Sequence, residues 1–325
     1  MKHPLFIATS DWHLTDTKPV CREEESDWYE AQFRVVEEIL KLAKPKDIPL
    51  IIAGDIFDKA KEASTYLLTE LRILFDKYEL SNVYAIAGNH DEPNHNFNLL
   101  KNSCFQIAEN MGIFSNLNNK GLLLEKNLFC YPFYDDFDNL EEVEDTEIYV
   151  IHQFVYVGKK PRPNAPEIGN ANNILRLFPK AKIVIAGDNH DGFVYQHPVT
   201  EQILVNCGAI IRDTAAQIDY KPRVYIVYND FSVEPYYLDI SKDKITNKHV
   251  QSEKERKEKE EMFIRTISST KDISLSFKIN VMKYWLNLFL VLALSSVFTV
   301  AKAQIPVRPY GQWEATQFVA VSVHQ

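Results

Sequence analysis

The chain has 325 residues, of which 46% are hydrophobic and 25% are charged, so it has the composition of an ordinary globular protein that can bury a sizeable core. The formal net charge of −9 argues against a protein that coats nucleic acid through a basic surface, but it leaves open a carboxylate-rich site for cations. The four cysteines form no C-x-x-C pair, which argues against a zinc knuckle or a disulfide framework and favours a cytoplasmic protein with reduced thiols.

Residues 1–240 alternate short apolar runs with stretches of helical periodicity. Apolar residues recur at helical spacing from Trp28 to Leu42 and again from Leu67 to Tyr78. Strand–helix alternation of this kind predicts an α/β fold built in layers. Eight runs have the length and β-branched content of buried strands, namely residues 5–9, 50–53, 83–87, 148–151, 183–186, 203–206, 224–228 and 233–238.

The character of the chain changes after residue 240. Residues 241–281 contain a dense run of mixed charges at 251–261, which predicts a solvated helix or a linker and could bind a partner. Residues 282–325 begin with a Met-Lys pair and an uncharged apolar stretch at 284–301, followed by small residues, as in a secretory signal. Three explanations stay open for this segment: a fused reading frame, a membrane anchor that contacts a bilayer through 284–301, and a soluble helix that packs on a partner.

Polar clusters follow five of the predicted strands. Because catalytic sites of open α/β sheets lie beyond the carboxyl ends of the strands, these clusters are expected to converge on one edge. A single cluster would be weak evidence, since polar residues after strands are common in turns, but five in order favour one shared site. The clusters contain Asp11 and His13, then Asp55 and Asp58, then Asn89, His90 and Asp91, then His152, and last Asp188 and His190.

The residue types in these clusters are those of a metal site. Oxygen and imidazole ligands without thiolate suit manganese, iron or zinc and disfavour a structural zinc site. Asp11 and His13 are two residues apart, so on an extended segment they would point to the same side and hold one ion together. Glycines precede three of the clusters, at Gly54, Gly88 and Gly187, and they would let the backbone turn beside the site.

The order of these motifs resembles the calcineurin-like metallophosphoesterase family, whose pattern runs D-x-H, G-D, G-N-H-D or G-N-H-E, a lone H, and G-H-x-H. The resemblance covers residues 5 to about 240 and implies a sandwich of mixed β-sheets flanked by helices, with a helical C-terminal extension. It also implies two divalent metal ions, with manganese expected first and iron or zinc as alternatives. Their ligands would be Asp11, His13 and His190 for one ion and Asn89, His152 and Asp188 for the other, with Asp55 shared.

The resemblance also assigns catalytic roles and contains one departure. His90 would face the scissile phosphate and Asp91 would orient it. Asp188 stands where the family usually has histidine, which should favour harder metals such as manganese over zinc.

The strings T-S-D-W-H-L, A-G-D-I-F-D and A-G-N-H-D resemble the SbcD-type DNA repair nucleases most closely. We therefore expect metal-dependent hydrolysis of phosphodiesters in DNA by a metal-activated hydroxide. The alternatives are a phosphatase or small-molecule phosphodiesterase with the same site, and a non-catalytic scaffold. The partners considered are DNA, an SbcC-like coiled-coil ATPase bound near residues 262–280, a membrane surface and a second copy of the chain.

Overall fold

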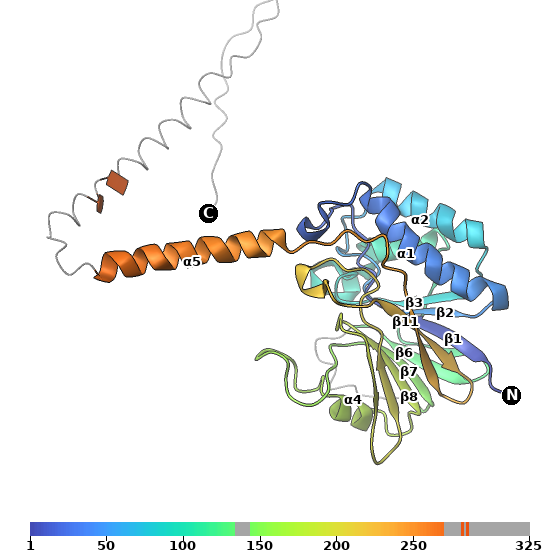
Figure 1. Cartoon of the computed structure of the whole chain (residues 1–325). Helices are drawn as coiled ribbons and strands as arrows, with labels where there is room; N and C mark the ends of the chain where they lie inside the picture. The colour runs from blue at the N-terminus through green and yellow to red at the C-terminus, as the bar shows by residue number, and fades with distance from the viewer. Residues whose placement is uncertain (134–143, 270–280, 283, 286–325) are drawn as a thin grey trace, which may run out of the picture. The chain divides into compact units, whose positions relative to one another are not determined.

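The computed structural model describes residues 1–133, 144–269, 281–282 and 284–285 (Figure 1). The chain divides into two compact units, Met1–Lys254 and Glu255–Gln325. The first unit contains all eight predicted strands and every predicted site residue.

Six strands form the first sheet, in the order β12-β11-β1-β2-β3-β4. The four strands from β1 to β4 run parallel, whereas β11 pairs antiparallel with β1 and β12 pairs antiparallel with β11. The sheet is therefore mixed, as the resemblance implied. The strands are β1 (Pro4–Thr9), β2 (Leu50–Ala53), β3 (Val83–Ile86), β4 (Ser115–Asn116), β11 (Arg223–Tyr228) and β12 (Val233–Tyr237).

Six further strands form the second sheet, in the order β5-β6-β7-β8-β10-β9. The central strands β6, β7, β8 and β10 are parallel, and the edge strands β5 and β9 are antiparallel to their neighbours. The sequence patterns missed β4, β5, β6 and β9; β5 and β9 are edge strands with mostly exposed side chains and so lack a continuous apolar signal. The strands are β5 (Lys120–Leu123), β6 (Asn127–Tyr131), β7 (Ile148–His152), β8 (Ile183–Gly187), β9 (Phe193–Gln196) and β10 (Ile203–Asn206).

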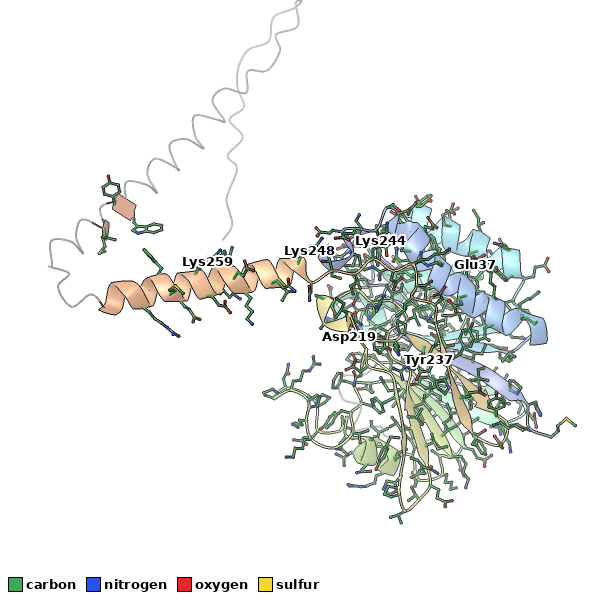
Figure 2. All side chains as sticks on the ribbon, viewed as in Figure 1. Glu37, Asp219, Tyr237, Lys244, Lys248 and Lys259 are labelled. Atoms are coloured by element: carbon green, nitrogen blue, oxygen red, sulfur yellow. The ribbon has the colours of Figure 1, made fainter. Side chains whose placement is uncertain are left out.

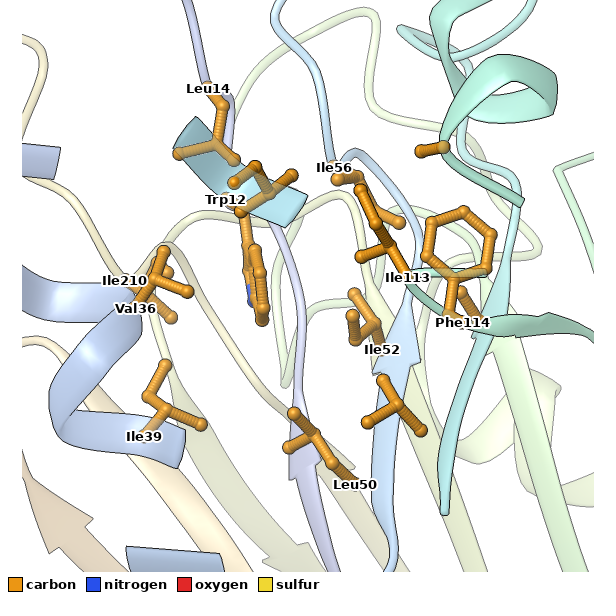
Figure 3. Close-up of a cluster of buried hydrophobic side chains, with 14 of the residues drawn as sticks. Trp12, Leu14, Val36, Ile39, Leu50, Ile52, Ile56, Ile113, Phe114 and Ile210 are labelled. Carbon is orange, nitrogen blue, oxygen red and sulfur yellow. The ribbon is translucent and has the colours of Figure 1, made fainter. Parts of the chain in front are cut away.

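The two sheets pack face to face, and helices cover their outer sides (Figure 1). Alternation along β1 shows how the layers are built, because Phe6 and Ala8 enter the core between the sheets while Ile7 faces the helices. The helix-side core contains Trp12 and Val36 among its fully buried members (Figure 3). The α/β sandwich predicted from the sequence is confirmed.

The helices start and stop where the sequence supplies caps. α1 (Trp28–Ala43) begins after Asp27, whose side chain accepts a hydrogen bond from the Glu30 amide, and α2 (Thr65–Tyr78) begins after Ser64 in the same way. α1 and α2 cover the first sheet with α3 (Cys104–Asn110), and α4 (Ala171–Leu177) covers the second sheet. Short 3₁₀ turns complete the connections at η1 (Val20–Arg22), η2 (Lys44–Lys46), η3 (Pro93–His95), η4 (Phe97–Asn102) and η6 (Ala215–Gln217).

The charged run of the sequence is helical. It lies in α5 (Lys248–Ser269), whose side chains are exposed from residue 254 to 265, and Figure 2 labels Lys248 and Lys259 on it. Its expected binding to a partner stays a prediction. Among the described residues, no helix has the length and apolarity needed to cross a membrane. The apolar stretch at 284–301 lies almost entirely outside them.

Candidate metal centre

The polar clusters meet at the junction of the two sheets, and not at the edge of a single sheet as the sequence suggested. β1, β2 and β3 of the first sheet deliver the first three clusters, and β7 and β8 of the second sheet deliver the last two. The His152 ring links the two sheets at this junction, because its Nδ1 atom, on β7, lies 2.6 Å from the carbonyl oxygen of Ala53 on β2. Face-to-face packing thus brings both sets of strand ends together.

Four of the predicted ligands have left-handed backbone conformations. The φ angles are 51° at Asp11, 45° at His13, 53° at Asp55 and 79° at Asp188. Such a conformation costs on the order of 1 kcal/mol or more for a non-glycine residue and persists where the surrounding structure enforces it. Asp11 and His13 therefore do not lie on an extended segment, although their side chains do converge as predicted.

Two glycines are required by close approach to these side chains. A Cβ at Gly54, which has a φ of 94°, would overlap the ring of His152. A Cβ at Gly88 would overlap the carboxylate of Asp55. Both glycines therefore make room for ligand side chains. The sequence analysis had expected them only to let the backbone turn.

One group of candidate ligands consists of Asp11, His13 and His190. Their ligand atoms lie within 4.8 Å of one another, and the rings of His13 and His190 have centroids 4.8 Å apart. The Nε2 atom of His13 lies 3.9 Å from Asp11 Oδ1. This is the set that the resemblance implied for one of the two ions.

A second group consists of Asp11, Asp55 and His152, with Asn89 beside it. His152 Nε2 lies 3.3 Å from Asp55 Oδ2 and 3.0 Å from Asn89 Oδ1. Because His152 Nδ1 contacts a carbonyl oxygen, it carries the proton of the neutral ring and leaves Nε2 as the ligand atom. Asn89 and His152 are thus brought together as implied for the second ion.

Asp55 lies between the two groups. Its Oδ2 atom is 3.6 Å from Nε2 of His13 and 3.3 Å from Nε2 of His152, while Oδ1 accepts a hydrogen bond from the His90 amide at 2.9 Å. Ligand atoms that share an ion are roughly 3 Å apart, given ligand bonds of about 2.1 Å. The position of Asp55 between both imidazoles fits the shared ligand that the resemblance implied.

Asp188 is placed differently from the other candidates. Its backbone amide donates to Asp11 Oδ1 at 3.1 Å, and its carboxyl group is not a member of any tight group among the residues described. Burial raises the pKa of the Asp188 carboxyl, and the neighbouring His152 partly offsets this effect. Asp188 therefore lies at the site, where the charges of His152, Asp11, Asp55 and His190 act on its carboxyl group.

The buried carboxylates of the site favour positive charge beside them. Burial by itself would lower the pKa of His13, but the Asp58 side chain and the charge of Asp55 outweigh it and raise that pKa to about 9. Burial opposes ionisation of Asp55 too, but His152 and His13 hold the pKa of Asp55 well below its usual value. Without a metal, protonated imidazoles thus supply the positive charge that the buried carboxylates need.

The unpaired atoms of the site fit metal ions. Oδ2 of Asp11 and both ring nitrogens of His13 are buried and have no hydrogen-bond partner in the described part of the chain. Buried polar atoms are rarely left in this state unless a water molecule or an ion meets them. Oxygen and imidazole donors in this arrangement suit divalent ions such as manganese, iron or zinc, but the arrangement does not select among them.

Asp58 is a site residue that the sequence analysis placed in the second polar cluster but to which it assigned no role. Its carboxylate oxygen Oδ1 lies 3.7 Å from Nδ1 of His13, and its carbonyl oxygen lies 2.6 Å from Nδ1 of His90. His13, Asp58 and His90 also form a third group of potential ligands. The available signal was the second aspartate of G-D-I-F-D, three residues after Asp55.

The role expected for Asp91 needs correction. Its carboxylate accepts hydrogen bonds from the amides of Ile56, Phe57 and Gly88, at 3.0–3.3 Å, and therefore fixes the loop around Asp55 instead of the ring of His90. Burial, and then the charge of Asp55, raise the pKa of Asp91 to about 6. The His90 ring is held by the Asp58 carbonyl.

Comparison with known proteins identifies a family for this chain. The profile of the family described as calcineurin-like phosphoesterase matches residues 4–192. A search of curated proteins gave no match.

Similar solved structures include a dimetal phosphatase from Danio rerio, with 13% identity, 73% of this chain and 96% of that chain covered, and a TM-score of 0.46. A 5'-nucleotidase from Staphylococcus aureus has 12% identity, 72% and 53% coverage and a TM-score of 0.43, so the chain spans about half of its length. A predicted phosphoesterase from Streptococcus pneumoniae has 13% identity, 76% and 94% coverage and a TM-score of 0.37.

Proposed function

The chain belongs to the calcineurin-like phosphoesterase family, and from that premise we propose that it hydrolyses small phosphoesters at a two-metal centre. The observation that carries the choice of a small substrate is a cavity of about 420 Å³ next to His90. Cavities of about 300–1,000 Å³ suit small molecules, whereas a nucleic acid needs an extended track of positive charge. The comparisons give nothing specific to SbcD-type nucleases.

The cavity is continuous with the metal centre. Asp58, Asn89 and His90 form part of its wall, and they belong to the site already described. Lys59 and Lys61 also line the cavity, but Lys59 is paired with Glu62 at 2.6 Å. Within the described parts of the chain Lys61 makes no ion pair, so its ammonium group can meet a polar or anionic group of a substrate's alcohol part.

The residues of the site have two kinds of role, which are to hold the metal ions and to transfer a proton. When bound, two divalent ions supply Lewis acidity and lower the pKa of water. Asp55 would contribute to both ions, with Asp11, His13 and His190 on one side and His152 and Asn89 on the other. Because Nδ1 of His90 donates to the Asp58 carbonyl, Nε2 is the nitrogen that can hold or release a proton next to the leaving oxygen.

An assay of the purified full chain with Mn²⁺ tests the proposal. We expect hydrolysis of p-nitrophenyl phosphate or bis-p-nitrophenyl phosphate and little cleavage of duplex or single-stranded DNA. Efficient DNA cleavage with negligible ester hydrolysis would overturn the small-substrate proposal in favour of the nuclease expected from the sequence strings. No hydrolysis of any substrate by metal-loaded protein would favour the scaffold.

Two separate lysine substitutions test whether the cavity binds the substrate. Lys61→Ala should raise the KM for small esters with a charged alcohol part and leave kcat close to that of the wild type. The matched control is Lys182→Ala, which removes a lysine from the wall of a separate cavity and should change neither constant. Equal effects of both substitutions would reject the cavity as the substrate site.

A further inference from the structure

The loop that carries His190 is held by hydrogen bonds more than by apolar packing. It connects β8 to β9, and residues 188–190 are only half-buried. A ligand on such a loop needs other restraints, because a small displacement of an imidazole weakens metal binding. The restraints come from the end of β10, a strand that follows the loop in sequence and lies beside both β8 and β9.

Three successive carbonyl groups of this loop are bound by the last residue of β10 and by the segment that follows it. Nδ2 of Asn206 donates to the carbonyl oxygen of Asn189 at 2.6 Å and to that of Asp191 at 2.8 Å. The amide of Ala209 donates to the carbonyl oxygen of His190 itself, at 3.0 Å. The peptide units on both sides of His190 are therefore fixed.

The orientation of the Asn206 amide follows from its partners. Two carbonyl oxygens can be met only by the NH₂ group, so Oδ1 must point the other way. Asn206 is fully buried, and its Oδ1 has no hydrogen-bond partner among the residues described. An asparagine at this buried position supplies two donors to the loop, which an apolar residue of similar size cannot do.

The same segment also restrains the opposite ligand. The Ile210 amide donates to the carbonyl oxygen of Asp11 at 3.4 Å, and the Asp188 amide donates to Asp11 Oδ1 at 3.1 Å. Residues 206–210 thus connect the backbone of Asp11 to the loop of His190. These two ligands belong to one group, so their relative position is set through this connection.

We propose that Asn206 is a positioning residue for the metal ligand His190. Its amide group fixes the loop so that the imidazole of His190 meets Asp11 and His13. The inference rests on the metal centre and is independent of the substrate. Groups that orient metal ligands in this way are typically worth about 10- to 100-fold in metal affinity.

The test is a titration of metal-free full-length protein with Mn²⁺, followed by calorimetry. Asn206→Leu keeps the branched shape but removes both donors. We expect one of the two sites to weaken by about 10- to 100-fold while the other, which contains His152, keeps its affinity. If the leucine variant does not fold, Asn206→Ala tests the same loss with less steric demand.

The matched control is Gln202→Leu. Gln202 is a buried amide immediately before the other end of β10, and its Nε2 donates at 2.8 Å to the carbonyl oxygen of Phe178, away from the metal centre. It should lose a similar amount of thermal stability and keep both metal affinities. Unchanged affinities in Asn206→Leu, or equal losses in both variants, would overturn the positioning role. Absence of metal binding by the wild type would overturn the metal centre and this inference with it.

Discussion

Replacing Asp243 by asparagine should destabilise the first unit strongly, because this carboxylate is shared by three arginines. Oδ1 lies 2.9 Å from Arg34 Nη2 and 3.2 Å from Arg22 Nη2, and Oδ2 lies 2.9 Å from Arg212 Nη2. The side chains of Asp243, Arg22 and Arg212 are only 5%, 2% and 6% exposed. Asp243 follows the last strand, β12, and its carboxylate thus links that part of the chain to Arg22 in η1, to Arg34 in α1 and to Arg212.

The magnitude follows from what the substitution leaves behind. Glu25 stays 2.7 Å from Arg22, and Arg34, at 20% exposure, can turn towards water. Arg212 is buried and pairs with no other carboxylate among the described residues, so the substitution leaves its charge buried without a counter-ion there. Breaking a buried ion pair in this way costs about 3–5 kcal/mol. For a domain of this size that corresponds to a fall in Tm of roughly 6–20 °C.

Thermal and urea unfolding of Asp243→Asn against wild type measure this loss. Asp239→Asn is the matched control, since Asp239 is an exposed carboxylate on the same segment and its loss should change stability by less than about 0.5 kcal/mol. The difference should persist in 1 M NaCl, because buried pairs are screened little. A loss below about 1 kcal/mol, or one abolished by salt, would refute the argument from burial.

Four other outcomes are expected. His90→Ala should lower kcat by about 10²–10⁴ while elemental analysis still finds the wild-type metal content; loss of an ion would make His90 a ligand. Asp188→His should shift the activity ratio from Mn towards Zn, and identical ratios would argue against Asp188 as a ligand. Glu37, labelled in Figure 2, has its pKa lowered to about 2, first by Lys77, so its contribution is present above pH 4.5 and is lost as the pH falls towards 2. Glu37→Gln should therefore be less stable than wild type at pH 7, by under about 1 kcal/mol given its exposure, and the gap in urea unfolding should close in acid; a constant gap would contradict the ion-pair origin. A chain ended at residue 281 should be more soluble and equally active per molecule, and unfolding of its first unit would show that the tail is part of the enzyme.

Much of the fold could be predicted from local patterns. Apolar runs such as residues 50–53 and 183–186 are buried on both faces, so their composition alone indicates strands. Helices α1 and α2 were visible through their periodicity. The edge strands β5 and β9 were not, because a strand exposed on one or both faces needs no apolar pattern.

The sequence by itself determined which residue types follow the strands, and hence that Asp11, Asp55, His152 and the others could form a metal site. Only the tertiary structure decided how they meet, because the clusters come from two different sheets whose ends are joined by packing. The left-handed backbone at Asp11 and His13 has no local sequence signal, since it is imposed by the surrounding fold. For the same reason, only the structure shows that Asp58 holds His90 and that Asn206 holds the His190 loop, because hydrogen bonds between residues 15 to 32 positions apart depend on which strands become neighbours.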